Sequence, residues 1–261
     1  MSFKDHFSAA AAGYARFRPG YPAGLFAWLA SLAPGRGLAW DCGTGSGQAA
    51  AGLAAHFERV VASDPSRQQL ALAEPRPNVE YRLAAAEASG LVAASVDLLT
   101  VAQALHWFDL ERFYAEARRV LKPGGVIAAW TYTLLEASHG IGALLEDFHK
   151  NVVGPFWPPE RRMVEDGYRS LPFPFEPIAA PPFEIRCEWT RDDLLGYLGT
   201  WSATRAYARE KGIDPLEDFA RRLEPLWPQA GAKRALRWPL HLRVGRAAAG
   251  TGPQHAQGRG S

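Results

Sequence analysis

Residues 38–66 read LAWDCGTGSGQAAAGLAAHFERVVASDPS, and this stretch decides the fold. It places Gly43, Gly45 and Gly47 between an apolar run and an alanine-rich run, and a second apolar run ends at Asp64. A glycine-rich turn between a strand and a helix lets a ligand approach backbone amides and the positive end of the helix. The stretch therefore predicts a strand, a ligand-binding turn, a helix and a second strand.

The spacing of the glycines narrows the choice of ligand. A dinucleotide-binding turn places its last glycine at the position that Gln48 holds here, so that the helix can pack closely beneath a pyrophosphate. Asp41, at the end of the first strand, adds a carboxylate that would repel a pyrophosphate. The turn therefore favours a cofactor that has an amino group and no phosphate, although a NAD-dependent dehydrogenase stays open as an alternative.

Short apolar runs alternate with helix-like stretches along the first half of the chain. The runs lie at 38–42, 59–63, 79–84, 97–102 and 126–131. Helices are expected over 22–32 and 109–121, the second because its apolar residues recur on one helical face. This alternation is typical of an α/β fold, here a Rossmann-like, doubly wound, mainly parallel seven-stranded sheet.

The composition divides the chain into four parts. Residues 1–132 are expected to form the cofactor-binding core with an N-terminal cap segment. Residues 133–185 are expected to form a helical, proline-rich substrate lobe inserted after the fifth strand, because eight prolines between 151 and 184 leave little regular structure. This lobe is either a loop packed over the sheet or a lid over a ligand. Residues 186–246 complete the sheet and add helices, and residues 247–261 are expected to be disordered.

Charge and cysteine content disfavour several classes of protein without excluding them. The net charge is +2, from 29 basic and 27 acidic residues, so we expect neither a nucleic-acid nor a membrane partner. Cys42 and Cys187 lie far apart and suggest neither a disulfide nor a metal site. No apolar run approaches the roughly 18 residues of a membrane span, and the first residues lack a signal-peptide pattern. A cytoplasmic protein, monomeric or weakly dimeric, is expected.

The segment from Asp41 to Gly47 resembles the first motif of class I S-adenosylmethionine-dependent methyltransferases. The resemblance implies that S-adenosylmethionine is the cofactor and that an acidic residue ending the second strand holds its ribose, which a carboxylate suits by accepting two hydrogen bonds. The implied cofactor contacts are Asp41, Gly43, Thr44, Gly45 and Gln48 in the turn, Asp64 and Pro65 after the second strand, Ala86 and Glu87 after the third, and Gln103 after the fourth. Asp64 could instead cap the following helix, and Glu87 could be an ordinary loop residue.

Two further segments extend the resemblance. AQALHWFD (102–109) and FSAAAAGYARFRPGYP (7–22) are similar to segments of the methyltransferase type 11 group and of the trans-aconitate methyltransferase branch. His106 and Trp107 fall where the fourth strand ends, the place where ligands bind in open α/β sheets, and they are candidate catalytic residues together with Tyr14. Arg18 is a candidate clamp for a carboxylate. Alternatively, His106 is a hydrogen-bonding residue, and Trp107 and Phe108 pack against the next helix.

The resulting prediction is methyl transfer to a small-molecule acceptor, with a carboxylate or a hydroxyl as the group methylated. The reaction is expected to be a metal-independent, in-line displacement in which a histidine base, titrating near about 6.5, is needed only if the acceptor must lose a proton. Arg161, Arg162 and Arg169 are candidates for binding an acidic acceptor. A nucleic-acid or protein methyltransferase and a non-catalytic cofactor-binding protein stay open as alternatives.

Overall fold

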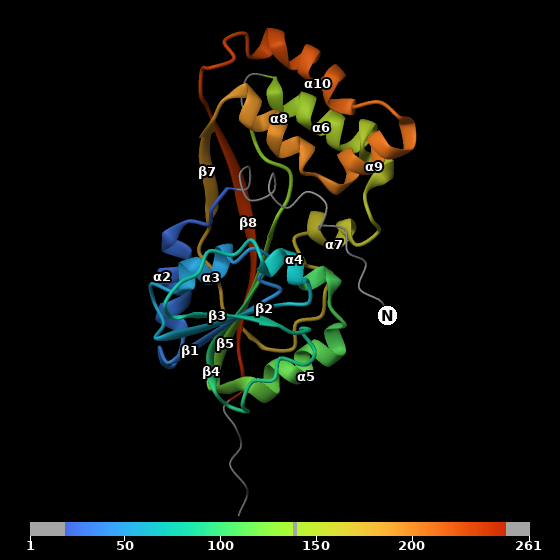
Figure 1. The fold of residues 1–261 in the computed structure, drawn as a ribbon. Helices are drawn as coiled ribbons and strands as arrows, with labels where there is room; N and C mark the ends of the chain where they lie inside the picture. Colours follow the sequence, from blue (N-terminus) through green and yellow to red (C-terminus); the bar gives the residue numbers. More distant parts are fainter. Residues whose placement is uncertain (1–18, 138–139, 249–261) are drawn as a thin grey trace, which may run out of the picture.

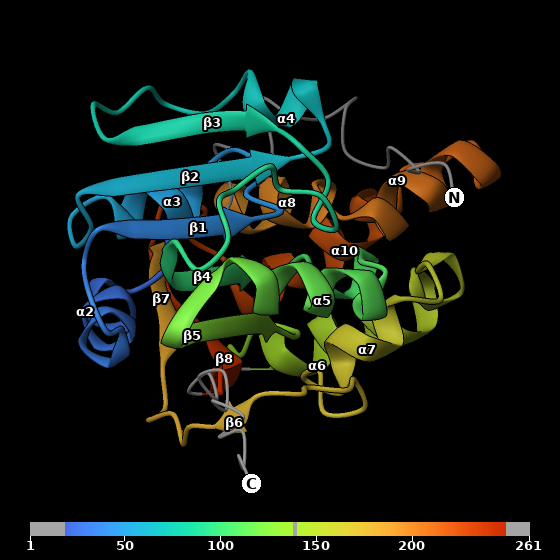
Figure 2. The same ribbon diagram turned by 90° about the horizontal axis from the view of Figure 1, so that it is seen from below.

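The computed structural model describes residues 19–137 and 140–248. Over these ranges the chain forms one eight-stranded sheet with the order β3-β2-β1-β4-β5-β8-β6, and β7 pairs with β8 beyond this path (Figures 1 and 2). The strands are β1 (Leu38–Cys42), β2 (Arg59–Asp64), β3 (Val79–Leu83), β4 (Val96–Ala102), β5 (Leu121–Tyr132), β6 (Glu176–Pro177), β7 (Glu184–Trp189) and β8 (Arg234–Arg246).

The strand directions confirm the predicted α/β, Rossmann-like class. Strands β1 to β5 pair in parallel, whereas β8 runs antiparallel to β5, from Tyr132 opposite Leu240 to Val126 opposite Arg246. The sheet has eight strands rather than the expected seven, since the first part of β8 continues past β5 and pairs with β7, and the two-residue strand β6 also pairs with β8.

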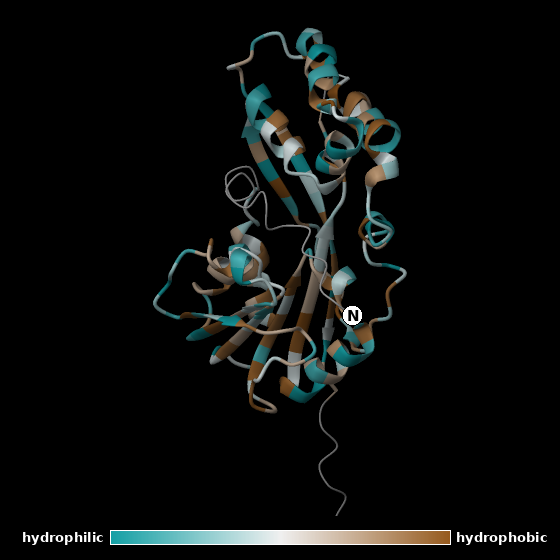
Figure 3. Ribbon diagram, turned by 45° about the vertical axis from the view of Figure 1, so that its right-hand side comes forward, coloured by the Kyte–Doolittle hydropathy of each residue, from teal (hydrophilic) through white to brown (hydrophobic). Residues whose placement is uncertain are grey.

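Helices cover both faces of the sheet, as expected for a doubly wound fold. Helices α2 (Ala23–Leu32) and α3 (Gln48–Leu53) pack on one face, where their side chains join a core that includes Trp130. Helix α5 (Leu110–Val120) packs on the other face around Trp40 and Phe113. The strands are rich in apolar residues while the helices carry polar outer faces (Figure 3). Strands β1, β2 and β4 are buried along almost their whole length, as expected for a parallel sheet with helices on both faces.

A helical lobe lies beyond the carboxyl ends of the parallel strands, with β7 and β8 leading into it (Figure 1). Its helices come from both sides of β7 in the sequence, so the lobe is not made by residues 133–185 alone. They are α6 (Ile141–Asp147), the π-helical turn Phe148–Val152, the 3-10 turn η4 (Gly154–Phe156), α7 (Arg161–Glu165), α8 (Arg191–Gly199), α9 (Ser202–Lys211), α10 (Pro215–Leu223) and the 3-10 turn Glu224–Leu226. Among the described residues, none of the helices is long and apolar enough to cross a membrane.

The proline-rich segment has two different environments. Tyr168, Leu171 and Phe175 are buried in the core on the α5 face, and the Tyr114 hydroxyl donates to the Pro172 carbonyl at 2.8 Å. Trp157, Pro158 and Arg161, in contrast, border a cavity described below. The segment is therefore partly scaffold and partly pocket wall, which combines the two interpretations drawn from the sequence.

The end of the chain can be followed only in part. The amide of Ala247 donates to the Gly125 carbonyl at 2.8 Å, and the Ala247 side chain is buried. The rest of the segment expected to be disordered lies, from residue 249 onward, outside the described residues.

Candidate active site

The glycine-rich turn has the conformation that its sequence predicts. Gly43, Gly45 and Gly47 all have positive φ angles, of 68°, 57° and 84°, a region that side chains rarely adopt. A Cβ on Gly43 would lie 2.6 Å from the Ala104 Cβ, whereas a Cβ on Gly45 would meet only the Gln69 Oε1 at 3.8 Å. The turn is therefore tightly packed at Gly43 and open at Gly45, where a ligand can approach the backbone.

Asp64 joins this turn to the end of β2. One carboxylate oxygen accepts from the Gly45 amide at 2.9 Å and the other accepts from the Ser66 amide at 2.8 Å. The cap of helix α4 (Arg67–Leu70) is Ser66, whose hydroxyl accepts from the Gln69 amide, so Asp64 does not cap that helix. Asp64 also borders the pocket described below.

Asp41 lies behind the turn rather than in front of it. Its side chain is fully buried and accepts from the hydroxyls of Thr44 at 2.5 Å and Thr100 at 2.8 Å. Burial raises the pKa of Asp41 to about 6, despite these hydrogen bonds. In this structure Asp41 fixes the position of Thr44 and does not border the pocket, so its predicted contact with a cofactor stays a prediction.

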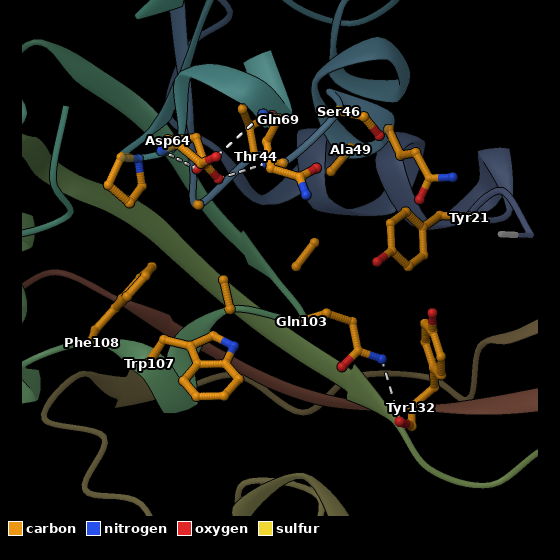
Figure 4. Close-up of a pocket in the computed structure, with 17 residues that line it drawn as sticks. Tyr21, Thr44, Ser46, Ala49, Asp64, Gln69, Gln103, Trp107, Phe108 and Tyr132 are labelled. Atoms are coloured by element: carbon orange, nitrogen blue, oxygen red, sulfur yellow. Dashed lines mark hydrogen bonds between the residues drawn. The ribbon is translucent and has the colours of Figure 1, made fainter. Parts of the chain in front are cut away.

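The turn and the ends of the parallel strands enclose a pocket of about 870 Å³, called the first pocket (Figure 4). The residues that border it are Tyr21, Gly43, Thr44, Gly45, Ser46, Gln48, Ala49, Asp64, Pro65, Ser66, Gln69, Ala102, Gln103, Ala104, Trp107, Phe108 and Tyr132.

The side chain of Gln69 indicates what kind of ligand the first pocket accepts. Its Oε1 atom is buried and has no hydrogen-bond partner within the described part of the chain, although a buried acceptor normally finds one. It lies on the same wall as the Asp64 carboxylate, a second acceptor. This wall therefore fits a ligand with donor groups, such as the hydroxyls and amino group of an adenosine.

A second pocket, of about 730 Å³, adjoins the first and shares Gln103, Trp107 and Tyr132 with it. Aromatic rings form much of its wall and Arg161 is the charged residue on it. Its other lining residues are His106, Thr133, Trp157, Pro158, Val164, Tyr197, Thr200, Trp201 and Ser202. The guanidinium of Arg161 lies 4.5 Å from the centre of the Trp157 ring and 3.6 Å from Glu165. Two molecules bound side by side would therefore meet at the three shared residues.

His106 and Gln103 each take part in hydrogen bonds beside the second pocket. Its Nδ1 lies 2.8 Å from the hydroxyl of Tyr168, which is fully buried. The Thr131 hydroxyl donates to the Gln103 Oε1 at 2.8 Å, and the Gln103 side-chain amide donates to the Tyr132 carbonyl at 3.3 Å. Burial and the positive charge of Arg161 lower the pKa of His106 to about 3. The expected titration near 6.5 is therefore wrong for this histidine, which is neutral across the ordinary pH range.

Gln103 and Tyr168 have unusual backbone conformations. Gln103 has a φ of 57° and Tyr168 a φ of 64°, and Ala94 is the only other described non-glycine residue with a positive φ. Such conformations cost on the order of 1–3 kcal/mol and persist where the surroundings hold them in place. Tyr168 contacts His106 directly, and Gln103 lies three residues before it in the sequence. Both unusual backbone conformations therefore lie next to His106.

The structure places the predicted site residues in four groups. Those that border the first pocket are Gly43, Thr44, Gly45, Gln48, Asp64, Pro65, Gln103 and Trp107. His106 borders the second pocket, as Trp107 also does. Neither pocket is bordered by Asp41, Ala86 or Glu87. The side chains of Asp41 and Ala86 are buried, and the Glu87 carboxylate accepts from the Asp109 amide at 3.0 Å. Tyr14 and Arg18 lie outside the described residues.

Several residues at the site were not singled out by the sequence. Gln69, Tyr132 and Trp201 border the pockets, and Tyr168 contacts His106. Phe108 borders the first pocket and also packs on Phe113 with ring centres 4.9 Å apart, which is the packing expected across a helix start. Within the described ranges no three His, Cys, Asp or Glu side chains are grouped so that they could hold a metal ion.

Comparison with known proteins gives one consistent result. The methyltransferase domain family matches residues 40–129. A Dictyostelium discoideum protein named as a methyltransferase is 35% identical over 221 residues, which cover 83% of this chain and 84% of that protein. An uncharacterized methyltransferase of Mycobacterium tuberculosis is 34% identical over 70% of both chains. A structure described as a type II methyltransferase of Anaeromyxobacter dehalogenans is 49% identical, with a TM-score of 0.85 over 89% of this chain and 99% of that one.

Proposed function

The chain belongs to the class I S-adenosylmethionine-dependent methyltransferases, and from this premise we propose that it methylates a small molecule held in the second pocket. The observation that carries the proposal is the junction of the two pockets at Gln103, Trp107 and Tyr132. A methyl donor in the first pocket and an acceptor in the second would have their reacting atoms at this junction.

The residues of the first pocket fit S-adenosylmethionine. The Asp64 carboxylate would accept from the ribose hydroxyls, and Gln69 offers an acceptor that lacks a partner among the described residues. The open backbone at Gly45 lets the cofactor approach the turn. When bound, this cofactor supplies a methyl group that its sulfonium has already activated, so the protein has little covalent chemistry to perform.

The main contribution of the protein is to hold the acceptor in line with the methyl group. Positioning of this kind supplies on the order of 7–11 kcal/mol. The indole of Trp107, which borders both pockets, would add roughly 0.5–2 kcal/mol if it faces a desolvated cation. Neither contribution requires a metal ion.

The walls of the second pocket favour a small molecule over a polymer. It is lined by residues from α7, α8 and α9, by Trp157 just after η4, and by residues that follow the ends of β4 and β5. Concave pockets lined by aromatic side chains are typical of small-ligand sites. The near-neutral net charge of +2 gives no field for a nucleic-acid substrate.

Two measurements test the proposed function. Calorimetric titration should give binding of S-adenosylmethionine and S-adenosylhomocysteine, and no binding of NAD. Incubation of the protein with methyl-labelled S-adenosylmethionine and a low-molecular-weight cell extract should place label in a small-molecule product. Label found only in the nucleic-acid or protein fraction of a whole lysate would contradict the small-molecule acceptor.

A further inference from the structure

The second pocket has a single full charge on its wall. Among the described residues that line it, Arg161 is the only one whose side chain is charged at neutral pH, since the low pKa of His106, about 3, keeps that ring neutral. The other lining groups are aromatic rings, aliphatic groups, hydroxyls and the amide of Gln103. A molecule bound in this pocket therefore meets a positive charge on an otherwise uncharged wall.

The structure selects Arg161 from the three arginines that the sequence offered for an acidic acceptor. Arg161 is half-buried and borders the second pocket, whereas Arg162 and Arg169 are exposed and border neither pocket. The Nε of Arg169 donates to the Asp166 carbonyl at 2.7 Å. Only Arg161 is therefore placed to contact a molecule in the second pocket.

The guanidinium of Arg161 is held at the wall by its neighbours. It lies 4.5 Å from the centre of the Trp157 ring, which lines the same pocket, and one of its terminal nitrogens lies 3.4 Å from the His149 Nε2. A long side chain that is already held in place loses less conformational freedom when a ligand binds to it. Arg161 is therefore preorganised for binding.

The nearby carboxylate of Glu165 leaves the charge of Arg161 effective inside the pocket. The two side chains approach to 3.6 Å, but that of Glu165 is 44% exposed and borders neither pocket, so water screens this ion pair. Burial and then the charge of Arg161 lower the pKa of His106, another lining residue. The field of Arg161 thus reaches across the second pocket.

Arg161 lies away from the place where methyl transfer would occur. It borders only the second pocket, whereas the reacting atoms would meet at the residues that both pockets share. These are Gln103, Trp107 and Tyr132, which Figure 4 shows across the cavity from Asp64 and Gln69. Arg161 therefore faces a part of the acceptor other than the atom that receives the methyl group.

We propose that Arg161 determines the specificity of the second pocket: it pairs with a carboxylate that the acceptor keeps when another of its atoms is methylated. The acceptor is then a small organic carboxylate. This inference rests on the proposed function and adds the substrate class to it. In the transfer, a lone pair of the methylated atom bonds to the methyl carbon while the carbon–sulfur bond breaks and its electron pair stays on sulfur. Any proton on the methylated atom is released to water.

The charge of Arg161 favours a carboxylate over other groups. Aromatic walls alone would also suit an ammonium group, but the guanidinium repels one. A guanidinium and a carboxylate are both planar and pair through two parallel hydrogen bonds. One positive charge matches the single negative charge of a carboxylate, whereas a phosphate monoester carries about −1.5 to −2 at neutral pH.

Four probes that share one ring test the charge preference without any reaction. Benzoate, benzamide, benzylamine and phenyl phosphate are titrated by ligand-observed NMR into the full-length protein saturated with S-adenosylhomocysteine. We expect benzoate to bind about 10-fold or more tightly than each of the others, as a charge-assisted hydrogen bond would give. Equal binding of all four, or a preference for benzamide or benzylamine, would overturn the inference. A preference for phenyl phosphate would replace the carboxylate by a phosphate.

Four variants separate binding by Arg161 from structural support. Arg161→Gln should abolish the preference for benzoate, and Arg161→Lys, which keeps the charge without the planar fork, should retain part of it. Glu165→Gln removes the neighbouring carboxylate and should leave benzoate binding equal or tighter. Arg162→Gln is the matched control and should change nothing. Weaker benzoate binding in Glu165→Gln, by as much as in Arg161→Gln, would mean that Arg161 only supports the fold through that ion pair.

The labelled product tests the same inference in the reaction. Product formed from the low-molecular-weight extract should bind an anion exchanger at neutral pH and elute at about pH 2, where a carboxylate is protonated. For the acceptor purified by following the label, the KM should rise by about 10- to 100-fold in Arg161→Gln. The affinity for S-adenosylhomocysteine should stay unchanged, because Arg161 does not border the first pocket.

The outcomes distinguish this inference from the proposed function. Labelled product that carries no negative charge would overturn the retained carboxylate while leaving methyl transfer established. A preference for benzoate that depends on Arg161, without transfer of label to any small molecule, would support the role of Arg161 and contradict the proposed function.

Discussion

Asp64 accepts a hydrogen bond from the Gly45 amide at 2.9 Å, so the residue expected to bind ribose also holds the glycine-rich turn in place. One side chain thus connects the ends of two adjacent parallel strands, β1 and β2, at the point where a ligand would lie. Binding and local structure are therefore coupled at Asp64, and an experiment on it must separate the two.

Replacing Asp64 by Ala should weaken S-adenosylhomocysteine binding by about 10- to 100-fold, because hydrogen bonds to a charged group are worth about 1.5–3 kcal/mol. Calorimetry measures the affinity and thermal unfolding measures the stability. Asp109→Ala is the control: it removes another aspartate that accepts from a backbone amide, at the start of α5, and it should lower stability alone. Equal losses of affinity in both variants would mean that Asp64 acts only through the fold.

Gly45→Ala should reduce cofactor affinity because its Cβ would occupy the open side of the turn. Gly124→Ala is a matched control, since Gly124 also has a positive φ, of 73°, and a Cβ at this position would meet no other atom within 4 Å. Both variants carry a backbone penalty of about 1–2 kcal/mol, visible in urea unfolding. Only Gly45→Ala should bind S-adenosylhomocysteine more weakly, and unchanged binding would place the ligand away from the turn.

The core of the fold was predictable because its signals are local. The turn at Gly43, Gly45 and Gly47 and the five parallel strands follow from glycine positions and apolar runs, and Asp64 follows from its place at a strand end. Strand β8 was expected to rejoin the sheet, and it pairs with β5.

The second pocket was not predictable for the opposite reason. Its walls come from α7, α8, α9 and the residues after η4, which no shared motif connects, and the contact between His106 and Tyr168 spans 62 positions in the sequence. Helix α9 was not predicted because its residues show no strong apolar face. One local signal precedes Tyr168 in the sequence, the glycine at position 167. Gly167 has a positive φ of 67°, and Tyr168 has a positive φ as well.

Asp41→Asn should change how stability depends on pH. The unfolded carboxyl loses its proton near about 3.9, whereas the buried one does so at about 6. The folded state therefore binds more protons between these values, and the free energy of unfolding falls as the pH rises through this window, by on the order of 3 kcal/mol in total. Urea unfolding from pH 4 to 7 should show this fall in the wild type and a flatter curve in Asp41→Asn. Parallel curves would contradict the buried, raised carboxyl.

Arg161→Gln should raise the pKa of both His106 and His149. Burial is the main cause of their low pKa values, about 3 and about 4, and Arg161 is the next cause for each. The rise should be larger at His149, since Glu165 lies 3.6 Å from its Nε2. Proton NMR titration checks this, with Arg162→Gln as the control because Arg162 is exposed and borders neither pocket. Equal titration in both variants would show that burial alone sets the two values.

His106→Gln tests whether the ring takes a proton during the reaction. Cofactor affinity should barely change, because His106 borders only the second pocket. Glutamine keeps a hydrogen-bonding group but cannot accept a proton near neutral pH, so turnover of a hydroxyl or amine acceptor should fall by about 10²–10⁴-fold. His149→Gln is the control, since His149 is a second buried histidine with a low pKa that borders neither pocket, and it should keep the wild-type rate.

The His106→Gln variant also tests how the rate depends on pH. Because the pKa of His106 is about 3, the ring is neutral at and above pH 5. His106 should therefore cause no change in rate with pH near pH 6.5, and the loss of rate in His106→Gln should be the same from pH 6 to 8. A loss that instead varies tenfold per pH unit across this range would mean that His106 titrates there, and a full-rate His106→Gln enzyme would leave positioning as the sole contribution of the protein.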